Sequence, residues 1–152
     1  MTTDQNKDLV RRFHEAMDNG DVDAALEFWA SDAINHGGGR PGRQPKIGLD
    51  GLRRVLESLR VAFPDRQWLV EDMIAEGDTV ACRVTVSGTF GDVPEIPVES
   101  TPLLANVSPT GKSYSVQQVH IFRIAGGKLV EHRAVRDDLA LVQQLGALPQ
   151  LG

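Results

Sequence analysis

Apolar positions recur along the chain with two different periods. In the first 62 residues they return every three to four positions, and between residues 67 and 136 they mostly alternate with polar ones. The first period predicts amphipathic helices and the second predicts half-buried strands. Helices grouped early and strands grouped late indicate an α+β protein rather than alternating βαβ units.

Three helices are predicted before the strands. The first spans Thr3 to Asn19, with Thr3 as its cap and Gly20 at its end. Asp21 caps the second, which we expect to contain Trp29 and to end at residues 31–32, before a short extended piece at 33–36. The third covers residues 49–62 and is stopped by Pro64. Residues 37–45 (GGGRPGRQP) are too rich in Gly and Pro for regular structure and form either a connector or a lid.

Strands are predicted at residues 67–74 and 79–90. Residues 91–109 contain four prolines and read as a long irregular excursion, with a short strand at 103–107 as one alternative. A curved antiparallel or mixed sheet wrapped by the three helices, with a further helix after residue 137, would form a cone with one open end.

The segment 113–146 is interpreted as strand, tight turn, strand and helix. Alternation places Gln118, His120 and Phe122 on one face of the first strand, and His132 and Arg136 on one face of the second. A two-residue turn at 126–127 would set His120 opposite residue 133. A three-residue loop at 125–127 with a glycine bulge would set it opposite His132.

We favour the three-residue loop, because it gathers Gln118, His120, His132 and Arg136 on one face. Polar groups framed by apolar ones suit the floor of a small-molecule pocket. An ordinary half-buried sheet, in which neighbouring groups satisfy the histidines and the glutamine, fits the same spacing.

Composition narrows the choice of partners. The chain has 152 residues, 41% of them hydrophobic and 24% charged, with a net charge of −5. These values indicate one domain that binds neither nucleic acid nor an anionic membrane. The polar N-terminus lacks a signal-peptide core, and the single Cys82 excludes an intramolecular disulfide, so we expect a cytoplasmic protein. Cys82 alternates with valines and is interpreted as a core thiol rather than a nucleophile.

The order of elements and several short motifs resemble the SnoaL-like polyketide cyclases of the nuclear transport factor 2-like superfamily. The motifs are Asn35, Gln118-Val119-His120, Gly127-Lys128, Glu131-His132-Arg133 and Gln144-Leu145-Gly146. The resemblance implies a pocket for a flat polyketide ester, contacted by His120, Gln118 and Asn35, and chemistry without a metal or an organic cofactor. It also implies a catalytic aspartate two positions after His132.

That aspartate position is Ala134 in this chain. Losing the only general base lowers catalysis by about 10²–10⁴-fold, so cyclase activity does not carry over directly. Relatives that act in hydroxylation without this aspartate resemble the segment 134–138 (AVRDD) more closely.

The sequence therefore predicts a polyketide-tailoring protein that is cyclase-like or hydroxylase-like. His120, Asn35 and Arg136 are its candidate catalytic residues, with Arg136 paired with Asp72 or Asp138. The candidate substrate contacts are Gln118, His132, Phe122, Trp29 and Trp68.

Two other functions stay open, namely a non-catalytic binding module and an epoxide-hydrolase-like site that activates water through an Asp-Arg-Asp arrangement. The outer sheet face, with Val119, Ile121, Leu129 and Val135, predicts a homodimer. No metal is expected, because the four histidines lack metal-ligand spacing. The resemblance implies that no organic cofactor is needed either.

Overall fold

The computed structural model describes residues 1–37, 44–91, 104 and 107–147. Its elements, in chain order, are α1 (Thr3–Asp18), α2 (Val22–Leu26), β1 (Trp29–Asn35), β2 (Lys46–Ile47), α3 (Leu49–Ala62), β3 (Gln67–Glu76), β4 (Thr79–Thr89), β5 (Ser113–Ala125), β6 (Lys128–Arg136) and α4 (Asp138–Gln144).

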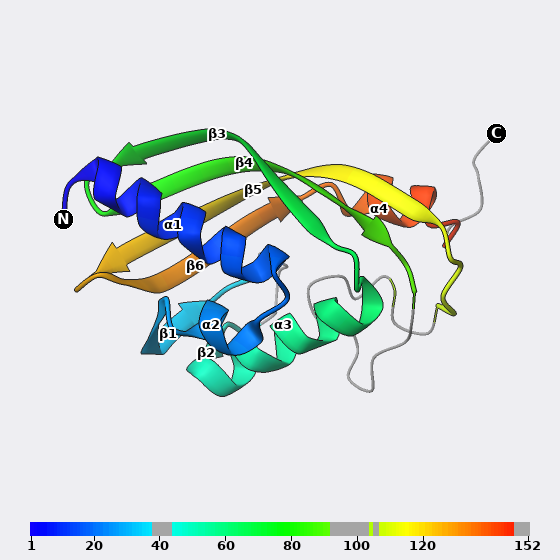
Figure 1. Ribbon diagram of the computed structural model, residues 1–152, viewed down its shortest axis with the longest axis horizontal. Coiled ribbons are helices and arrows are strands. Elements are labelled where there is room, and N and C mark those ends of the chain that lie inside the picture. Colours follow the sequence, from blue (N-terminus) through cyan, green and yellow to red (C-terminus); the bar gives the residue numbers. More distant parts are fainter. Residues whose placement is uncertain (38–43, 92–103, 105–106, 148–152) are drawn as a thin grey trace.

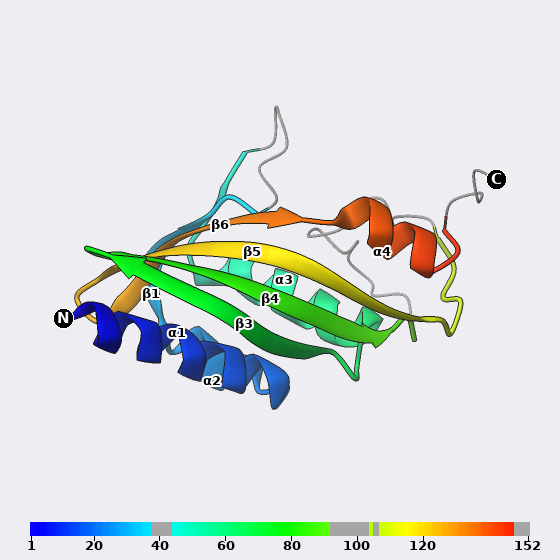
Figure 2. The same ribbon diagram turned by 90° about the horizontal axis from the view of Figure 1, so that it is seen from above.

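The strands form one sheet in the order β2-β1-β6-β5-β4-β3. β1 runs parallel to β6, and the other neighbours are antiparallel. Figures 1 and 2 show the long strands arching over the helices, with α1 along one side, α3 beneath the arch and α4 beyond the end of β6. The predicted α+β fold, a curved mixed sheet wrapped by three N-terminal helices and a C-terminal helix, is confirmed.

Local signals explain how the first two helices begin. The Thr2 hydroxyl accepts a hydrogen bond from Gln5 N, and the Gln5 side chain accepts one from Thr2 N, which is a capping box. The cap is thus Thr2 rather than the predicted Thr3. The Asp21 side chain accepts a hydrogen bond from Ala24 N, and α2 begins there as predicted.

The predicted extension of the second helix to Trp29 is wrong. α2 ends at Leu26, and Trp29 is the first residue of β1. Leu129 N donates a hydrogen bond to Phe28 O over 2.8 Å, and Trp29 pairs with Leu129. Pairing with a strand about a hundred residues away therefore overrides the local helical pattern. Trp29 remains in the core, with 4% of its surface exposed.

Both predicted registers of the β5–β6 hairpin are also wrong. Ala125 pairs with Lys128 across a two-residue turn whose glycines, Gly126 and Gly127, both have positive φ, as a type I′ turn requires. A bulge between residues 123 and 124 then shifts the pairing by one, so that His120 lies opposite Ala134. The observed register differs from the favoured one by two positions. It has the same parity, so the predicted shared face is retained.

Because of the same bulge, the residues on the outer sheet face differ from the predicted set. Leu129, predicted to lie on that face, is fully buried and pairs with Ile124, while Val119, Ile121 and Val135 are exposed as expected. A bulge places two residues opposite one, so the residue at that point changes faces.

Two predicted loops lie largely outside the described residues, namely the connector or lid at 37–45 and the excursion at 91–109 with its alternative short strand. From the excursion, Leu104 is described and buried, with 5% exposed. None of the described helices has the length and hydropathy needed to cross a membrane.

Candidate functional site

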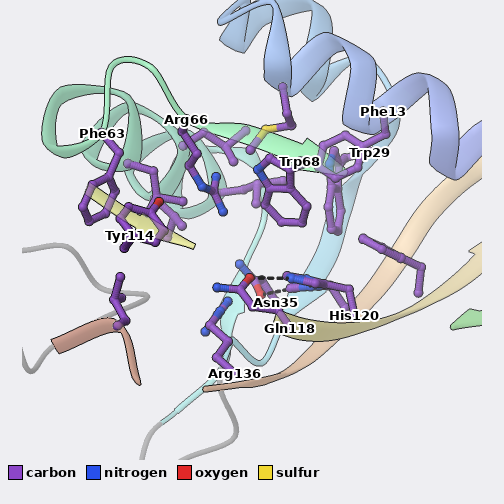
Figure 3. A pocket seen from close by; sticks show the side chains of 18 residues that line it. Phe13, Trp29, Asn35, Phe63, Arg66, Trp68, Tyr114, Gln118, His120 and Arg136 are labelled. Atoms are coloured by element: carbon purple, nitrogen blue, oxygen red, sulfur yellow. Dashed lines mark hydrogen bonds between the residues drawn. The ribbon is translucent and has the colours of Figure 1, made fainter. Parts of the chain in front are cut away.

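A pocket lies between the concave face of the sheet and the helices. It holds about 630 Å³ of space free of atoms, counted out to its open mouth. All eight residues singled out from the sequence line it, and their roles stay predictions: Trp29, Asn35, Trp68, Gln118, His120, Phe122, His132 and Arg136. Apolar side chains from α1, α3 and α4 complete the wall. The pocket thus combines aromatic and aliphatic walls with a few polar groups (Figure 3).

The pocket floor is a hydrogen-bonded chain of two amides and two imidazoles. His120 Nε2 lies 2.9 Å from Gln118 Oε1, and His120 Nδ1 lies 2.8 Å from His132 Nε2. His132 Nδ1 lies 2.9 Å from Asn35 Oδ1, which also accepts a hydrogen bond from Gly37 N. Strands β5, β6 and β1 each contribute to this chain, because Asn35 pairs with His132 across the parallel β1–β6 ladder.

Burial keeps both imidazoles neutral at neutral pH. The pKa values of His120 and His132 both lie well below 6.5, first because the rings are removed from water. His132 lowers the pKa of His120 further, and the positive charge of Arg136 lowers both.

The number of hydrogens available to these contacts relates the protonation of His120 and His132 to the orientation of the Gln118 amide. The three contacts need three hydrogens, and two neutral imidazoles supply two. Asn35 Oδ1 is held by Gly37 N, so the Gln118 NH₂ group must supply the third. With a neutral pair, the amide therefore turns its NH₂ toward His120 and its oxygen toward the pocket. With a protonated pair, the amide takes the opposite orientation.

This arrangement decides which atoms face a ligand. All four ring nitrogens of His120 and His132 are engaged within the floor, so a proton can reach them from a ligand only if Gln118 moves. The Asn35 NH₂ group makes no hydrogen bond among the described residues, and Asn35 lines the pocket. Asn35 is therefore a preorganised donor for a ligand oxygen.

The opposite wall carries a cation and aromatic rings that the sequence interpretation missed. The half-buried guanidinium of Arg66 lies 4.2 Å from the centre of the Trp68 ring and interacts electrostatically with the Tyr114 hydroxyl. Burial lowers the pKa of Arg66 to about 10, so the group remains a cation at neutral pH. The pKa of Tyr114 is raised by burial, so its hydroxyl remains protonated.

A glycine makes room for this arrangement. Gly88 pairs with Tyr114 across β4 and β5, and a Cβ at Gly88 would lie 3.2 Å from Tyr114 Cε1 and 3.3 Å from its hydroxyl oxygen. A larger residue would press on the ring, which also packs edge-on against Phe63 at 5.0 Å between ring centres.

Extending the alternation by two residues would have found both missed polar groups. Tyr114 shares its strand face with Gln118 and His120, and Arg66 stands two positions before Trp68. The aliphatic residues contributed by α3 lie on the buried face of that amphipathic helix.

No carboxylate is among the described residues that line the pocket. Ala134 is buried directly opposite His120, where the resembling cyclases carry their aspartate. Asp72, a suggested partner of Arg136, instead pairs with Arg83 at 2.6 Å and does not line the pocket. The Asp-Arg-Asp arrangement therefore lacks its carboxylates in the described lining.

Two other titratable groups lie in the core. Cys82 is buried, and burial raises the pKa of its thiol to about 12, which fits the core role predicted for it. His14 stacks on Trp68 at 4.7 Å between ring centres, and both of its ring nitrogens lack a hydrogen-bond partner in the described part of the chain. Burial lowers the pKa of His14 to about 3, with a smaller contribution from Arg66.

The fold and the pocket together define a class of protein, an α+β cone that holds a ligand cavity between a curved sheet and its helices. Comparison with known families is more specific. The family model described as SnoaL-like polyketide cyclase matches residues 7–145. The chain belongs to this family.

Named relatives lie at moderate distance. The chain is 29% identical over 141 residues to the aklanonic acid methyl ester cyclases DauD of Streptomyces sp. (strain C5) and DnrD of Streptomyces peucetius. These alignments cover 91% of this chain, with 80% of DauD and 89% of DnrD.

Two solved structures share both the fold and part of the sequence. AclR from Streptomyces galilaeus, proposed to be a hydroxylase, superposes with a TM-score of 0.79 at 28% identity, covering 99% of this chain and 87% of AclR. IdmH from Streptomyces antibioticus, proposed to be a polyketide cyclase, gives 0.73 at 28% identity, covering 93% of this chain and 99% of IdmH.

Proposed function

We propose that this protein binds an aromatic polyketide and acts on it without a metal or an organic cofactor. The reaction is either ring closure or isomerisation at a polarised carbonyl, or hydroxylation in which one oxygen atom of O₂ enters the ligand and the other leaves as water, with two electrons from an external reductant. The observation that carries the proposal is the pocket floor, where Asn35 and Gln118 present amide groups beneath aromatic walls.

The floor suits a ligand carbonyl or enolate. The Asn35 NH₂ group is available to its oxygen, while His132 and Gly37 hold the other end of that amide in place. Fixed donors of this kind stabilise negative charge as it develops, because they need no reorganisation during the reaction. Arg136 adds positive charge from the neighbouring strand position. His120 and His132 act mainly by positioning the two amides.

A second candidate function is ligand binding without chemistry. It is favoured by Ala134 and by the lack of a carboxylate among the described lining residues, since ring closure in the resembling cyclases depends on an aspartate at that position.

Product mass distinguishes these functions. The protein is incubated with aklanonic acid methyl ester and related anthraquinones, with and without oxygen and a reductant. A product of unchanged mass indicates closure or isomerisation, a gain of one oxygen indicates hydroxylation, and binding without product indicates the second candidate.

The matched variants are Asn35→Ala in the pocket and Arg83→Ala on the outer face. We expect turnover to fall at least tenfold in the first and to stay unchanged in the second. Unchanged turnover in Asn35→Ala would overturn the role of Asn35.

We also propose a homodimer that associates through the outer sheet face. Val119 and Ile121 are each 38% exposed there and Val135 is 71% exposed, beside the charged Arg133. A half-apolar face of this kind suits self-association. We expect a dimer in light scattering at micromolar concentration and a monomer for Val135→Asp. A monomeric wild-type protein would contradict the proposal.

A further inference from the structure

The polar groups of the pocket are unevenly charged. Two arginines line it, Arg66 from the segment before β3 and Arg136 from the end of β6, and no carboxylate is among the described lining residues. Figure 3 shows the two side chains reaching into the pocket from opposite walls. Their mutual repulsion contributes to the lowered pKa of Arg66. The cavity therefore has positive charge on two sides.

Arg66 is held in place although it lacks an ion-pair partner among the described residues. The Tyr114 hydroxyl interacts with it electrostatically, and the Trp68 ring supports its flat face. Asp18 acts on it electrostatically without forming an ion pair, and its Oδ1 accepts a hydrogen bond from Trp68 N. A guanidinium fixed at a pocket wall can still offer N–H groups to a ligand.

We propose that the ligand carries a carboxylate, and that this group binds at the Arg66 side of the pocket between the two arginines. The inference rests on the proposed function, because it takes the ligand to be an aromatic polyketide. A half-buried cation without an ion-pair partner is unfavourable, and a ligand carboxylate would supply the missing negative charge. Arginine presents parallel N–H groups that match a carboxylate, and its aromatic support suits a ring that carries one.

This inference separates the chain from its named relatives. DauD and DnrD are named for a methyl ester. A methyl ester is neutral and would leave the charge of Arg66 without an ion-pair partner among the described residues. The free acid is therefore the expected form of the ligand here.

The test compares three probes of nearly equal shape, anthraquinone-2-carboxylate, its methyl ester and its primary amide. The chain has two tryptophans, Trp29 and Trp68, and both line the pocket, so quenching of their fluorescence reports binding directly. We expect the carboxylate to bind about tenfold or more tightly than either neutral probe. This preference should shrink as salt is added.

Variants locate the preference. Arg66→Met keeps a long apolar stem and should abolish the preference for the acid, while the ester still binds. Arg66→Lys should retain part of it, because the charge stays but the planar group is lost. Arg83→Met, on the outer face in a pair with Asp72, is the matched control and should change nothing.

The outcomes separate the two proposals. If the ester or the amide binds as tightly as the acid, or if Arg66→Met retains the preference, the carboxylate proposal is wrong and the aromatic pocket stands. If none of the probes binds at millimolar concentration, the aromatic pocket and the carboxylate proposal both fail.

Discussion

The floor of the pocket and its Arg66 wall differ in how far their polar groups are paired within the protein. On the floor, the imidazole nitrogens of His120 and His132 are all hydrogen-bonded within the protein. On the wall, the half-buried Arg66 interacts with the Tyr114 hydroxyl and the Trp68 ring and forms no ion pair with the described residues. The floor is therefore already satisfied without a ligand, whereas the charge on the wall is not.

This difference indicates that the floor stabilises the fold and that the Arg66 wall recognises a ligand. A satisfied polar network stabilises one arrangement and fixes the groups attached to it, here the amides of Asn35 and Gln118. An uncompensated charge contributes little to folding and is better explained by a ligand. Stability and recognition should therefore respond to different substitutions, which the following experiments test.

Placing an acid on the floor should have the largest effect. Ala134→Asp puts a carboxylate opposite His120, at the position of the aspartate in the resembling cyclases. We expect ring closure of aklanonic acid methyl ester to rise by about 10²–10⁴-fold, since a positioned general base contributes that much. Ala134→Asn is the control of equal size. If the Asp variant still binds the ester and closes it no faster than the Asn variant, the floor does not support cyclase chemistry.

Breaking the floor should strongly destabilise the fold. His120→Leu leaves His132 Nε2 and the Gln118 amide buried without partners, and we expect the free energy of unfolding to fall by about 2–4 kcal/mol. Urea denaturation measures this change.

Two further variants sharpen that measurement. Gln117→Leu, on the exposed face of the same strand, should change stability by less than about 0.5 kcal/mol. The double variant His120→Leu/His132→Leu should lose less unfolding free energy than the two single variants added together. In the double variant, neither histidine remains to be left without its partner. A loss below about 1 kcal/mol in His120→Leu would show that the network does not stabilise the fold.

Lowering the pH should destabilise the fold through His14, which lies between the floor and the Arg66 wall. His14 stacks on Trp68 and packs edge-on to His120. Its pKa falls from 6.5 to about 3 on folding, so the unfolded chain binds the proton more tightly. The stability that depends on a neutral His14 is therefore fully present above pH 6.5 and is lost as the pH falls toward 3. Between pH 7 and pH 5 the loss from this group is about 2 kcal/mol.

His14→Phe should remove this part of the pH dependence and leave the part due to the floor histidines. Urea unfolding at pH 7 and pH 5, for both proteins, gives the comparison. Equal losses in the two proteins would mean that His14 is not kept neutral by the fold.

Removing the cation from the wall should have the smallest effect on folding. Arg66→Met keeps the apolar contact with Trp68 and removes a charge that has no ion-pair partner among the described residues. We expect the unfolding free energy to stay within about 0.5 kcal/mol of wild type or to increase. A loss above about 2 kcal/mol would make Arg66 a structural residue and erase the contrast with the floor.

Much of the site could be predicted because alternation is a local signal. Gln118, His120 and Phe122 share a face whatever strand lies beside them, and His132 and Arg136 do the same on the next strand. The two faces coincide because the turn and the bulge together preserve parity. The neighbours across the ladder were predicted wrongly, since a single inserted residue moves every pair and leaves no clear mark in the sequence.

By itself, the sequence determined the cap of α2 at Asp21 and the inward faces of the strands, while it left the length of the glycine turn open. These features depend on interactions within a few residues. The tertiary structure decided that β1 pairs in parallel with β6, which brings Asn35 to His132. It also decided that Arg66 meets Tyr114 at the pocket wall. Such contacts join segments tens of residues apart, and their choice depends on how the whole sheet and its helices pack, which no local pattern records.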